Sequence, residues 1–342
     1  MCKIENLVRP NILNLQPYSS ARDEFNGSEG TFLDANENPF GSLNRYPDPY
    51  QNELKIKLAA LNKVTKENIC IGNGSDEIID LAFRIFCEPG KDKALTFSPT
   101  YGMYDVSAAI NDVELLKVPL TENFQINRDE LIPFLTDSNL KLIFICSPNN
   151  PTGNVIAEKE IEFILNNFNG IVIIDEAYIE FSAKQSRLKL IENYSNLIVS
   201  QTFSKAWGLA AARVGVAYSN KTIINFYNTI KPPYNVSELN QRAALNALNT
   251  KTEFDKNIKE ILKEKKILKT ELLKLNEVRK VYPSEANFLL VEFNNADNVY
   301  SYLVSQTIIT RNRTAQVKNC IRISVGTKEE NKILIRALKN RA

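Results

Sequence analysis

The chain has 342 residues, of which 44% are hydrophobic and 24% charged, so it can bury a large core and is expected to form two domains. Its net charge of +2 gives no electrostatic basis for binding nucleic acid or a membrane surface, and no apolar run approaches the length of a membrane span. The sequence contains no histidine, which excludes Ser-His-Asp and Cys-His catalysis and leaves proton transfer to Lys, Tyr, Asp, Glu or a cofactor.

The first part of the chain has little periodicity. Residues 1 to about 30 are predicted to form an arm that contains Tyr18, for which packing is the simpler role on the sequence alone. Residues 33–41 and 44–48 are dense in turn-forming residues, so they are predicted to be loops that either cover something or connect elements at the surface. A short amphipathic helix is predicted over residues 51–61.

A glycine turn at residues 72–77 (GNGSDE) joins a predicted strand, 69–71, to a predicted helix, 78–86. Free backbone N–H groups at such a helix start can bind an anion, so a phosphate site is predicted there, with a plain helix cap as the alternative. Both nucleotide signatures fail, because Glu77 stands where G-x-G-x-x-G needs its third glycine and no G-K-[ST] follows. The candidate phosphate ligands are Gly74, Ser75 and Asp76.

Three apolar runs, residues 94–97, 140–146 and 170–175, are predicted strands, and a helix is predicted over 158–168. Continuous apolar strands separated by helices indicate a mostly parallel sheet covered on both faces. Ligands of such sheets lie at the carboxyl ends of the strands. The candidate site residues at or just past those ends are Asn150, Asp175, Tyr178 and Lys205, with Tyr101 either stacking on a planar ring or simply packing.

Residues 202–215 form a polar elbow and a small-residue, helix-like segment between two predicted strands, 197–199 and 214–218. Its hydroxyls and its arginine suit a bound phosphate, and a lysine among them can form an imine with an aldehyde cofactor. The alternative is a surface turn with a solvated lysine. The residues concerned are Thr202, Ser204, Lys205 and Arg213.

The pattern changes after Ser219, which indicates a second, α+β domain. Helices are predicted over residues 237–248, 252–275 and 329–340, and strands over 287–293 and 320–325. Arg322 lies inside the second of these strands, where a buried arginine would need an anionic partner. Arg311 and Arg313 precede it in a polar loop, where solvent exposure is the simplest interpretation.

Together these candidates meet the needs of a pyridoxal phosphate enzyme. Lys205 would form the imine and move a proton, and Asp175 would keep the pyridine nitrogen protonated, so that the ring accepts electrons. Asn150 and Tyr178 fit the ring's 3-oxygen. The phosphate cup would comprise Gly74, Ser75, Asp76, Thr202, Ser204 and Arg213. Such an enzyme needs no histidine, because the lysine and the cofactor would carry out the proton transfers.

The order of Asn-Pro-Thr-Gly, Asp-Glu-Ala-Tyr, Ser-Lys with a later Arg-x-Gly, and Arg-Ile-Ser-Val-Gly resembles the fold type I, class II aminotransferases. Within them it most resembles the histidinol-phosphate aminotransferase family, over nearly the whole chain. The ranges that carry the resemblance are 15–22 (LQPYSSAR), 33–39 (LDANENP), 45–48 (RYPD), 74–77 (GSDE), 147–153 (SPNNPTG), 202–208 (TFSKAWG) and 321–327 (IRISVGT).

The resemblance implies a role for individual residues. Lys205 would be the Schiff-base lysine, Asp175 the partner of the pyridine nitrogen, and Tyr101 the residue stacked on the ring. Asn150 and Tyr178 would hold the 3-oxygen. Residues 210–212 replace a glycine-containing run often found in the family, which would alter packing but not chemistry.

The resemblance also implies a substrate pocket shared between two subunits. Tyr46 would reach the neighbouring subunit's cofactor phosphate, and Tyr18 and Asn36 would line the pocket. Arg322, helped by Arg311, would bind the glutamate carboxylate in one half-reaction and the substrate phosphate in the other. The loop at residues 310–314 leaves open whether Arg311 or Arg313 is the family's arginine.

The implied fold is a fold type I α/β transferase: a large domain with a mostly parallel sheet covered by helices, plus a smaller α+β domain. The expected division is an arm with part of the small domain at residues 1–45, the large cofactor-binding domain at 46–232 and the C-terminal small domain at 233–342. Five scattered cysteines without a Cys-x-x-Cys pair indicate reduced thiols in a cytoplasm and no metal site.

The implied protein is a homodimeric transaminase of L-histidine biosynthesis. It interconverts histidinol phosphate and imidazole acetol phosphate, with glutamate and 2-oxoglutarate as the other pair, and has no nucleic-acid or membrane partner. Alternatives within the cofactor class are a threonine-phosphate decarboxylase-like enzyme and a broad aromatic aminotransferase. A non-catalytic scaffold is the alternative from another class, but it would have no chemical need for Lys205, Asp175 and Arg213 together. A dinucleotide oxidoreductase is disfavoured by the missing third glycine.

Overall fold

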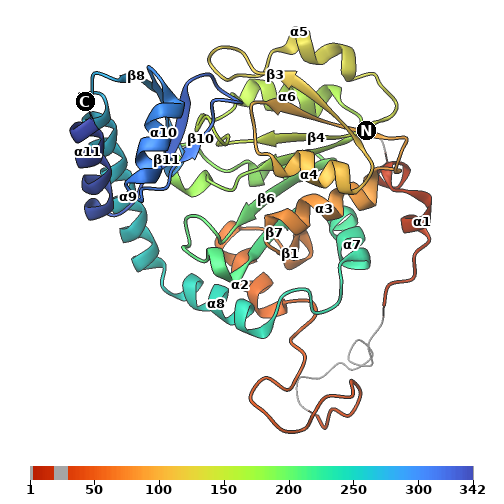
Figure 1. Ribbon diagram of the computed structural model, residues 1–342. Coiled ribbons are helices and arrows are strands. Elements are labelled where there is room, and N and C mark those ends of the chain that lie inside the picture. The colour runs from red at the N-terminus through yellow and green to blue at the C-terminus, as the bar shows by residue number, and fades with distance from the viewer. Residues whose placement is uncertain (1–2, 19–29, 342) are drawn as a thin grey trace.

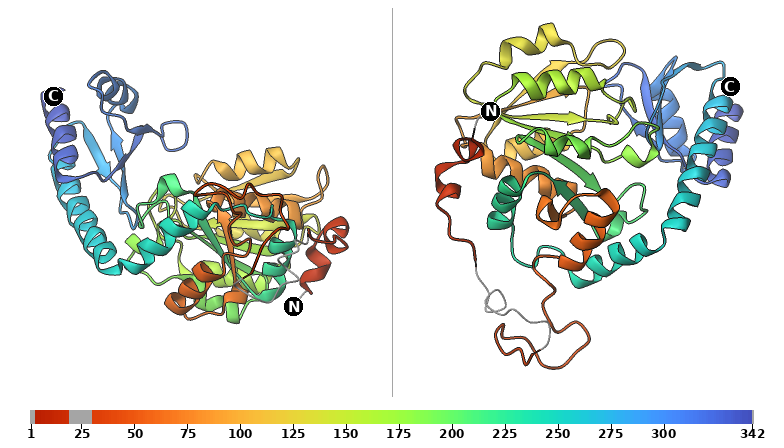
Figure 2. Two further views of the ribbon diagram at one scale, coloured as in Figure 1. Left: turned by 90° about the horizontal axis from the view of Figure 1, so that it is seen from below. Right: turned by 180° about the vertical axis from the view of Figure 1, so that it is seen from behind.

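A computed structural model describes residues 3–18 and 30–341 of the chain (Figure 1). Cys2 and residues 19–22, the end of the first motif range, lie outside the described residues. Two sheets organise the molecule, and Figure 2 shows the smaller one standing to one side of the larger. Within the described ranges, no helix is both long and apolar enough to cross a membrane.

The larger sheet has seven strands in the order β1-β7-β6-β5-β4-β2-β3. The strands from β2 to β6 run parallel, and β7 is antiparallel to both of its neighbours, so the expected mostly parallel sheet is confirmed. Their bounds are β1 (Ile69–Asn73), β2 (Lys93–Ser98), β3 (Glu114–Pro119), β4 (Leu140–Cys146), β5 (Ile171–Asp175), β6 (Leu197–Thr202) and β7 (Val214–Tyr218).

Helices cover both faces of this sheet, as its apolar strands require, since β5 and β7 are buried along their whole length. One face packs on α3 (Ser75–Phe86), α4 (Met103–Ile110) and α7 (Lys221–Ile230). The other packs on α2 (Asn52–Asn62), α5 (Arg128–Leu131), α6 (Glu158–Asn167) and α8 (Glu238–Asn249). The carboxyl-end edge of the sheet is therefore left to form a site.

The smaller sheet is antiparallel, in the order β10-β11-β9-β8. It comprises β8 (Val278–Val281), β9 (Phe288–Phe293), β10 (Arg311–Asn312) and β11 (Cys320–Ser324). One face packs on α9 (Lys251–Leu272), α10 (Ala296–Ser305) and α11 (Lys328–Arg341). Ile321 and Ile323 of β11 enter that core, so the alternation of a strand directs Arg322 to the opposite face.

The long helix α9 links the two sheets. Its second half packs in the core of the small sheet through Leu268 and Leu272. Its first half, around Phe254, packs in a cluster with Tyr178 and Phe288, which come from the large and the small sheet regions respectively. The carboxyl ends of the large sheet are thereby held against the Arg322 face of the small one.

The remaining elements are short. The N-terminal region contains α1 (Pro10–Leu13), and residues 30–50 loop away from the sheet, as Figure 1 shows at its lower edge. Leu33 and Phe40 of this loop are 89% and 82% exposed, although both are large and apolar. Short 3-10 helices occupy Ile4–Leu7, Lys66–Asn68, Ile132–Phe134, Ile179–Phe181, Arg187–Glu192 and Ala210–Ala212, the last being the expected helix-like segment.

The pairing of β1 with β7 leaves no space for a side chain at Gly215. A Cβ atom there would lie 2.3 Å from the carbonyl carbon of Gly74 and 2.4 Å from the amide nitrogen of Ser75. Both contacts are with backbone at the start of α3, so neither can be relieved by a side-chain rotation. The helix start and β7 can approach this closely only because position 215 is glycine.

Gly215→Ala is expected to destabilise the protein by about 1–3 kcal/mol, because the added methyl group must displace backbone. Gly102→Ala is the matched control: its Cβ would meet nothing within 4 Å, and its backbone φ of −71° suits alanine. Urea unfolding of the two variants measures the difference. An unchanged denaturation midpoint for Gly215→Ala would contradict the tight contact.

Candidate active site

A cavity of about 350 Å³ lies at the carboxyl ends of the large sheet, and arginines of the small sheet also line it. Eight of the expected site residues line it: Ser75, Tyr101, Asn150, Asp175, Tyr178, Lys205, Arg311 and Arg322. The other residues lining it are Cys146, Ala177 and Arg313. Residues from five strand ends and from β10 and β11 thus meet in one place.

Asp175 provides the cavity's buried carboxylate. It ends β5 and is only 2% exposed. The Tyr104 hydroxyl donates to its Oδ2 at 2.8 Å, and the Ala177 amide donates to its Oδ1 at 3.1 Å. Burial raises the pKa of Asp175 to about 6, and these two hydrogen bonds act in the opposite direction. This carboxylate lines the cavity and can therefore interact with a cationic group that binds there.

Lys205 provides the amine. It follows the end of β6, and its Nζ lies 5.6 Å from the centre of the Tyr178 ring. Partial desolvation of the amine, and then the nearby Arg322 guanidinium, lower the pKa of Lys205. A lowered pKa increases the fraction of neutral amine, which is the form that acts as a nucleophile or base.

An anion cradle forms where α3 begins. Gly74 caps this twelve-residue helix with φ of 80°, a backbone angle that favours glycine, and the helix start presents free N–H groups. Because Asn73 pairs with Val214 in the β1–β7 ladder, the preceding Arg213 is brought beside Gly74. Thr202 Oγ1 donates to Ser204 Oγ at 3.1 Å, which places two hydroxyls at the same point.

Arg213 is oriented within this cradle by two neighbours. Its Nη2 donates to Asp76 Oδ2 at 3.1 Å, and its Nη1 approaches Ser204 Oγ at 3.5 Å. Tyr101 donates to the other Asp76 oxygen at 3.0 Å. Asp76 therefore joins the arginine of the cradle to the aromatic ring at the side of the cavity.

Three arginines face the cavity from the small sheet. Arg311 and Arg322 are register partners in β10 and β11, and Arg322 donates to Asn150 Oδ1 at 2.5 Å. Burial of the guanidinium groups and their mutual repulsion lower the pKa of both Arg313 and Arg322. No described carboxylate forms an ion pair with any of the three, and the buried Nε of Arg313 has no hydrogen-bond partner among the described residues. Among the described residues Arg322 therefore has no anionic partner, as is expected where a ligand supplies the anion.

The donor set fits pyridoxal phosphate. The cradle suits its phosphate, the buried Asp175 carboxylate suits its basic ring nitrogen, and the Lys205 amine suits its aldehyde. The arginine face leaves space for a second anion. The buried Nε of Arg313, which has no hydrogen-bond partner among the described residues, indicates where that second anion would bind.

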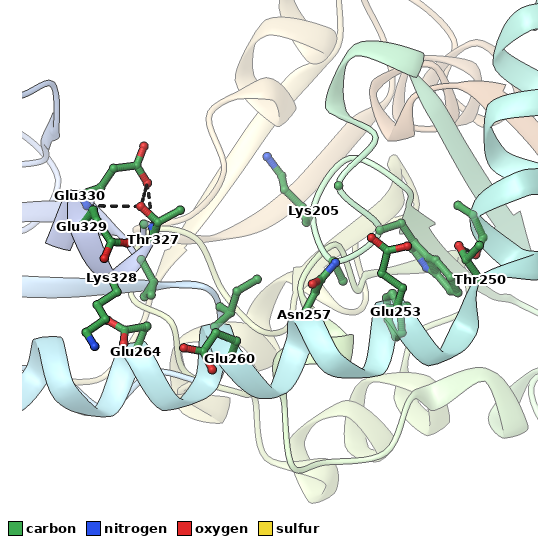
Figure 3. Close-up of a pocket in the computed structure, with 18 residues that line it drawn as sticks. Lys205, Thr250, Glu253, Asn257, Glu260, Glu264, Thr327, Lys328, Glu329 and Glu330 are labelled. Atoms are coloured by element: carbon green, nitrogen blue, oxygen red, sulfur yellow. Dashed lines mark hydrogen bonds between the residues drawn. The ribbon is translucent and has the colours of Figure 1, made fainter.

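A larger hollow, of about 820 Å³, lies on the other side of the Lys205 loop (Figure 3). It is lined by glutamates of α9, such as Glu253 and Glu260, and by Glu329 and Glu330 of α11. In Figure 3 the Lys205 amine points away from the α9 glutamates. Of the expected site residues only Lys205 lines this hollow, so the chemistry resides in the smaller cavity.

Three expected residues lie away from both the cavity and the anion cradle. Tyr18 is 70% exposed, and Asn36 and Tyr46 line a separate hollow of about 510 Å³. Tyr46 stacks on Tyr234 with ring centres 4.4 Å apart. Within this one chain, therefore, the N-terminal loop and the cavity are separate, and the roles expected for these residues stay predictions.

Sequence reasoning missed Tyr104, which lies behind Asp175 in the fully buried part of α4. Tyr101 precedes α4, which begins at Met103, so no helical spacing in the sequence linked the two tyrosines. For Arg313 the sequence left two possibilities open, solvent exposure and contact with the substrate. Only the turn between β10 and β11 brings it back over the cavity.

Comparisons with known proteins agree with this chemistry. A family model described as aminotransferase class I and II matches residues 25–338. Histidinol-phosphate aminotransferases from Cytophaga hutchinsonii and Bacteroides thetaiotaomicron are each 50% identical over 343 residues, covering 98% and 99% of this chain and the same shares of those proteins. The crystal structure of the histidinol-phosphate aminotransferase from Clostridium acetobutylicum aligns with a TM-score of 0.80 and 27% identity, over 87% of this chain and 91% of that one.

Asp175→Asn is expected to make the stability of the cofactor-free protein less dependent on pH. The folded pKa of about 6 exceeds the ordinary value of 3.8, so the folded state holds a proton that the unfolded state releases. This contribution to stability is fully present below about pH 4 and is lost as pH rises through 6.

The decline in unfolding free energy between pH 5 and pH 7 should therefore be shallower in Asp175→Asn, by up to about 1.4 kcal/mol per pH unit. Urea unfolding at a series of pH values measures this slope. Parallel slopes for the two proteins would show that Asp175 titrates normally.

Proposed function

The chain belongs to the family of class I and II aminotransferases, and from that premise we propose that it is the histidinol-phosphate transaminase of L-histidine biosynthesis. It is a pyridoxal phosphate-dependent enzyme that transfers an amino group reversibly between glutamate and imidazole acetol phosphate. The observation that carries the proposal is the meeting of Asp175, Lys205 and three arginines without carboxylate partners in one cavity. The 50% identity to relatives of that name supports the choice of substrate.

Pyridoxal phosphate, when bound, supplies an electron sink for the charge that develops at the substrate carbon. The helix start at Ser75, the hydroxyls of Thr202 and Ser204, and Arg213 hold its phosphate. Asp175 stabilises a protonated ring nitrogen through its buried carboxylate. Tyr101 lies at the side of the ring site, and Asn150 and Tyr178 offer an amide and a phenol to the ring's 3-oxygen.

Lys205 moves the proton. Its amine titrates below the ordinary lysine range, so it can accept a proton from the substrate carbon as a general base and return it elsewhere as a general acid. The chain contains no histidine, which is consistent with proton transfer by Lys205.

The arginine face selects the substrate by its distal anion. Glutamate and histidinol phosphate differ in shape, but each presents an anionic group remote from the amine that reacts. Arg322 and Arg313 supply planar guanidinium donors that suit both a carboxylate and a phosphate. One face can therefore serve both half-reactions, as a transaminase requires.

We further propose a homodimer with a shared active site. The loop at residues 30–50 exposes Leu33 and Phe40 almost fully, and it carries Asn36 and Tyr46 away from this chain's own cavity. Burial of these side chains on a second copy would remove the exposed apolar surface. Tyr46 would then contact the cofactor phosphate of the partner, with Asn36 and Tyr18 at its substrate pocket.

The remaining proposals concern organisation and location. The division at residues 45 and 232 is proposed as the domain boundary, with the large domain holding the cofactor. The cytoplasm is the proposed compartment, since the four buried cysteines in the described ranges, Cys70, Cys87, Cys146 and Cys320, are all free thiols.

Lys205→Ala is expected to lower transamination of histidinol phosphate with 2-oxoglutarate by at least about a hundredfold, because no other amine reaches this cavity among its lining residues. The unfolding midpoint should stay close to that of the unaltered protein, since the residue is exposed at the surface of the elbow. Coupled assay of glutamate formation gives the rate.

Lys184→Ala is the matched control, an exposed lysine outside the cavity, and should retain full activity. Normal turnover by Lys205→Ala would refute the assignment. Release of carbon dioxide from threonine phosphate by the unaltered protein, without transamination, would instead identify the decarboxylase alternative.

Arg313→Gln is expected to reduce kcat/KM for histidinol phosphate about tenfold or more, and Arg311→Gln by less. Arg313 is the more buried of the two and has a guanidinium nitrogen without a partner, whereas Arg311 is exposed. Unphosphorylated histidinol is the control substrate, and its kcat/KM should change little in either variant. A larger loss in Arg311→Gln would assign the phosphate contact to that residue.

A further inference from the structure

Tyr104 is a large polar side chain next to the cavity, and the proposed function does not yet assign it a role. It belongs to α4 and is fully buried. Its ring stacks on Phe144 of β4 with centres 4.9 Å apart, and the edge-to-face contact with Tyr101 has a centre distance of 5.7 Å. The ring is therefore fixed between the sheet and the residue at the side of the cofactor site. Only its hydroxyl reaches Asp175.

We propose that Tyr104 is a positioning residue for the reaction, which keeps the Asp175 carboxylate ionised and aimed at the cofactor's ring nitrogen by donating a hydrogen bond to Oδ2. This inference rests on the proposed function, because it assigns a task relative to pyridoxal phosphate. Tyr104 does not line the cavity, so it acts only through Asp175.

The hydrogen-bond inventory of Asp175 supports this role. Oδ1 is held by the backbone amide of Ala177, a contact that every residue at position 177 except proline would provide. Oδ2 is held by the Tyr104 hydroxyl, which among the described residues is the one hydrogen bond of this carboxylate that depends on side-chain identity. A buried carboxylate that loses a donor binds its proton more tightly, since hydrogen bonds to the charged form stabilise it.

The hydroxyl can serve only as a donor toward Asp175. Burial, followed by the Asp175 charge and the neighbouring Cys146, raises the pKa of Tyr104 well above the ordinary range, so its proton stays in place. The other ionisable groups around Asp175 are Asp76 from α3, Lys205 from the elbow, and Tyr101 and Tyr178 at the cavity wall. None of them forms a hydrogen bond with Asp175 in the described structure.

A packing role alone would be met by phenylalanine. The ring contacts with Phe144 and Tyr101 need no oxygen, and a buried hydroxyl costs free energy unless it is hydrogen-bonded. Tyr227 of α7 provides the comparison within this chain. It is equally buried, but its hydroxyl donates to the backbone carbonyl of Ile78 at 3.1 Å, a structural contact away from the cavity.

The test measures the dissociation constant of pyridoxal phosphate from cofactor-free protein between pH 6.5 and pH 9, for Tyr104→Phe and for the control Tyr227→Phe. The ratio of the variant's constant to that of the unaltered protein isolates the effect on the protein, because the ligand's own titrations are common to both. Tyr104→Phe is expected to raise the pKa of Asp175. Binding should therefore weaken about tenfold near pH 7, and the ratio should approach one near pH 9.

Two further measurements separate this role from a general loss of structure. In an Asp175→Asn background, Tyr104→Phe should not change cofactor affinity further, since the residue through which it acts is gone. Carbon-13 NMR of labelled aspartate carboxyls, with Asp175 identified by its absence from Asp175→Asn, should report a higher pKa for this group in Tyr104→Phe. This NMR measurement requires neither cofactor binding nor turnover.

Tyr227→Phe should give a ratio near one at every pH, whatever it does to the unfolding midpoint. A ratio for Tyr104→Phe that is independent of pH, or effects that add in the Asp175→Asn background, would overturn the inference. Those outcomes would leave the proposed function standing, provided that the unaltered protein binds pyridoxal phosphate. Failure of the unaltered protein to bind it would overturn both.

Discussion

The burial of one carboxylate, Asp175, is the constraint on which the site depends. An ionised group in a nearly dry environment is costly unless hydrogen bonds and an opposite charge stabilise it. The chain supplies two donors, and burial still holds the pKa of Asp175 at about 6. Lys205 already lowers this pKa, and a further cation in the cavity would stabilise the ionised carboxylate more. A protonated pyridine nitrogen would be such a cation, and the carboxylate in return keeps that nitrogen protonated.

The rest of the fold arranges complementary groups around that carboxylate. Parallel strands bring their carboxyl ends to one edge, so Asp175 and Lys205 meet although 30 positions separate them. The reversed strand β7 adds Arg213 to the start of α3, through a contact that glycine at 215 permits. The small sheet adds arginines from the opposite side, with α9 holding the two sheets together. The start of α3 and the arginines of the small sheet thus line one cavity together with a buried carboxylate.

Much of this arrangement could be predicted from the sequence, because the signals are local. β4 and β5 are apolar runs that end abruptly in polar residues, so Asn150 and Asp175 could be placed at strand ends. Helix α3 begins at Ser75, three residues before the apolar spacing starts. Gly74 and the acidic residues of the first turn, and not hydrophobic periodicity, determine where this helix begins. The family resemblance and the fold class were confirmed by the relatives and by the sheet order.

Features that depend on contacts between distant segments could not be predicted in this way. The hydrogen bond from Tyr104 to Asp175 spans 71 positions, and no local pattern distinguishes this tyrosine from a core residue. The short, partly exposed strands β3, β8 and β10 lack a continuous apolar run and were missed for that reason. The choice between Arg311 and Arg313 depends on how a tight turn directs each side chain. Tyr18, Asn36 and Tyr46 lie away from the cavity of this chain, and the proposed second subunit would bring them to a site.

The absorbance spectrum of the purified protein, recorded before and after glutamate and then after histidinol phosphate, tests the central claim most directly. A band at the violet end of the visible range is expected, and it should lose intensity with each amine separately, since both must react at Lys205 and both must bind the arginine face. Loss of the band with glutamate alone would retain the transaminase and contradict the substrate. No band, even after pyridoxal phosphate is added, would contradict the assignment of Asp175 and Lys205 to a cofactor site.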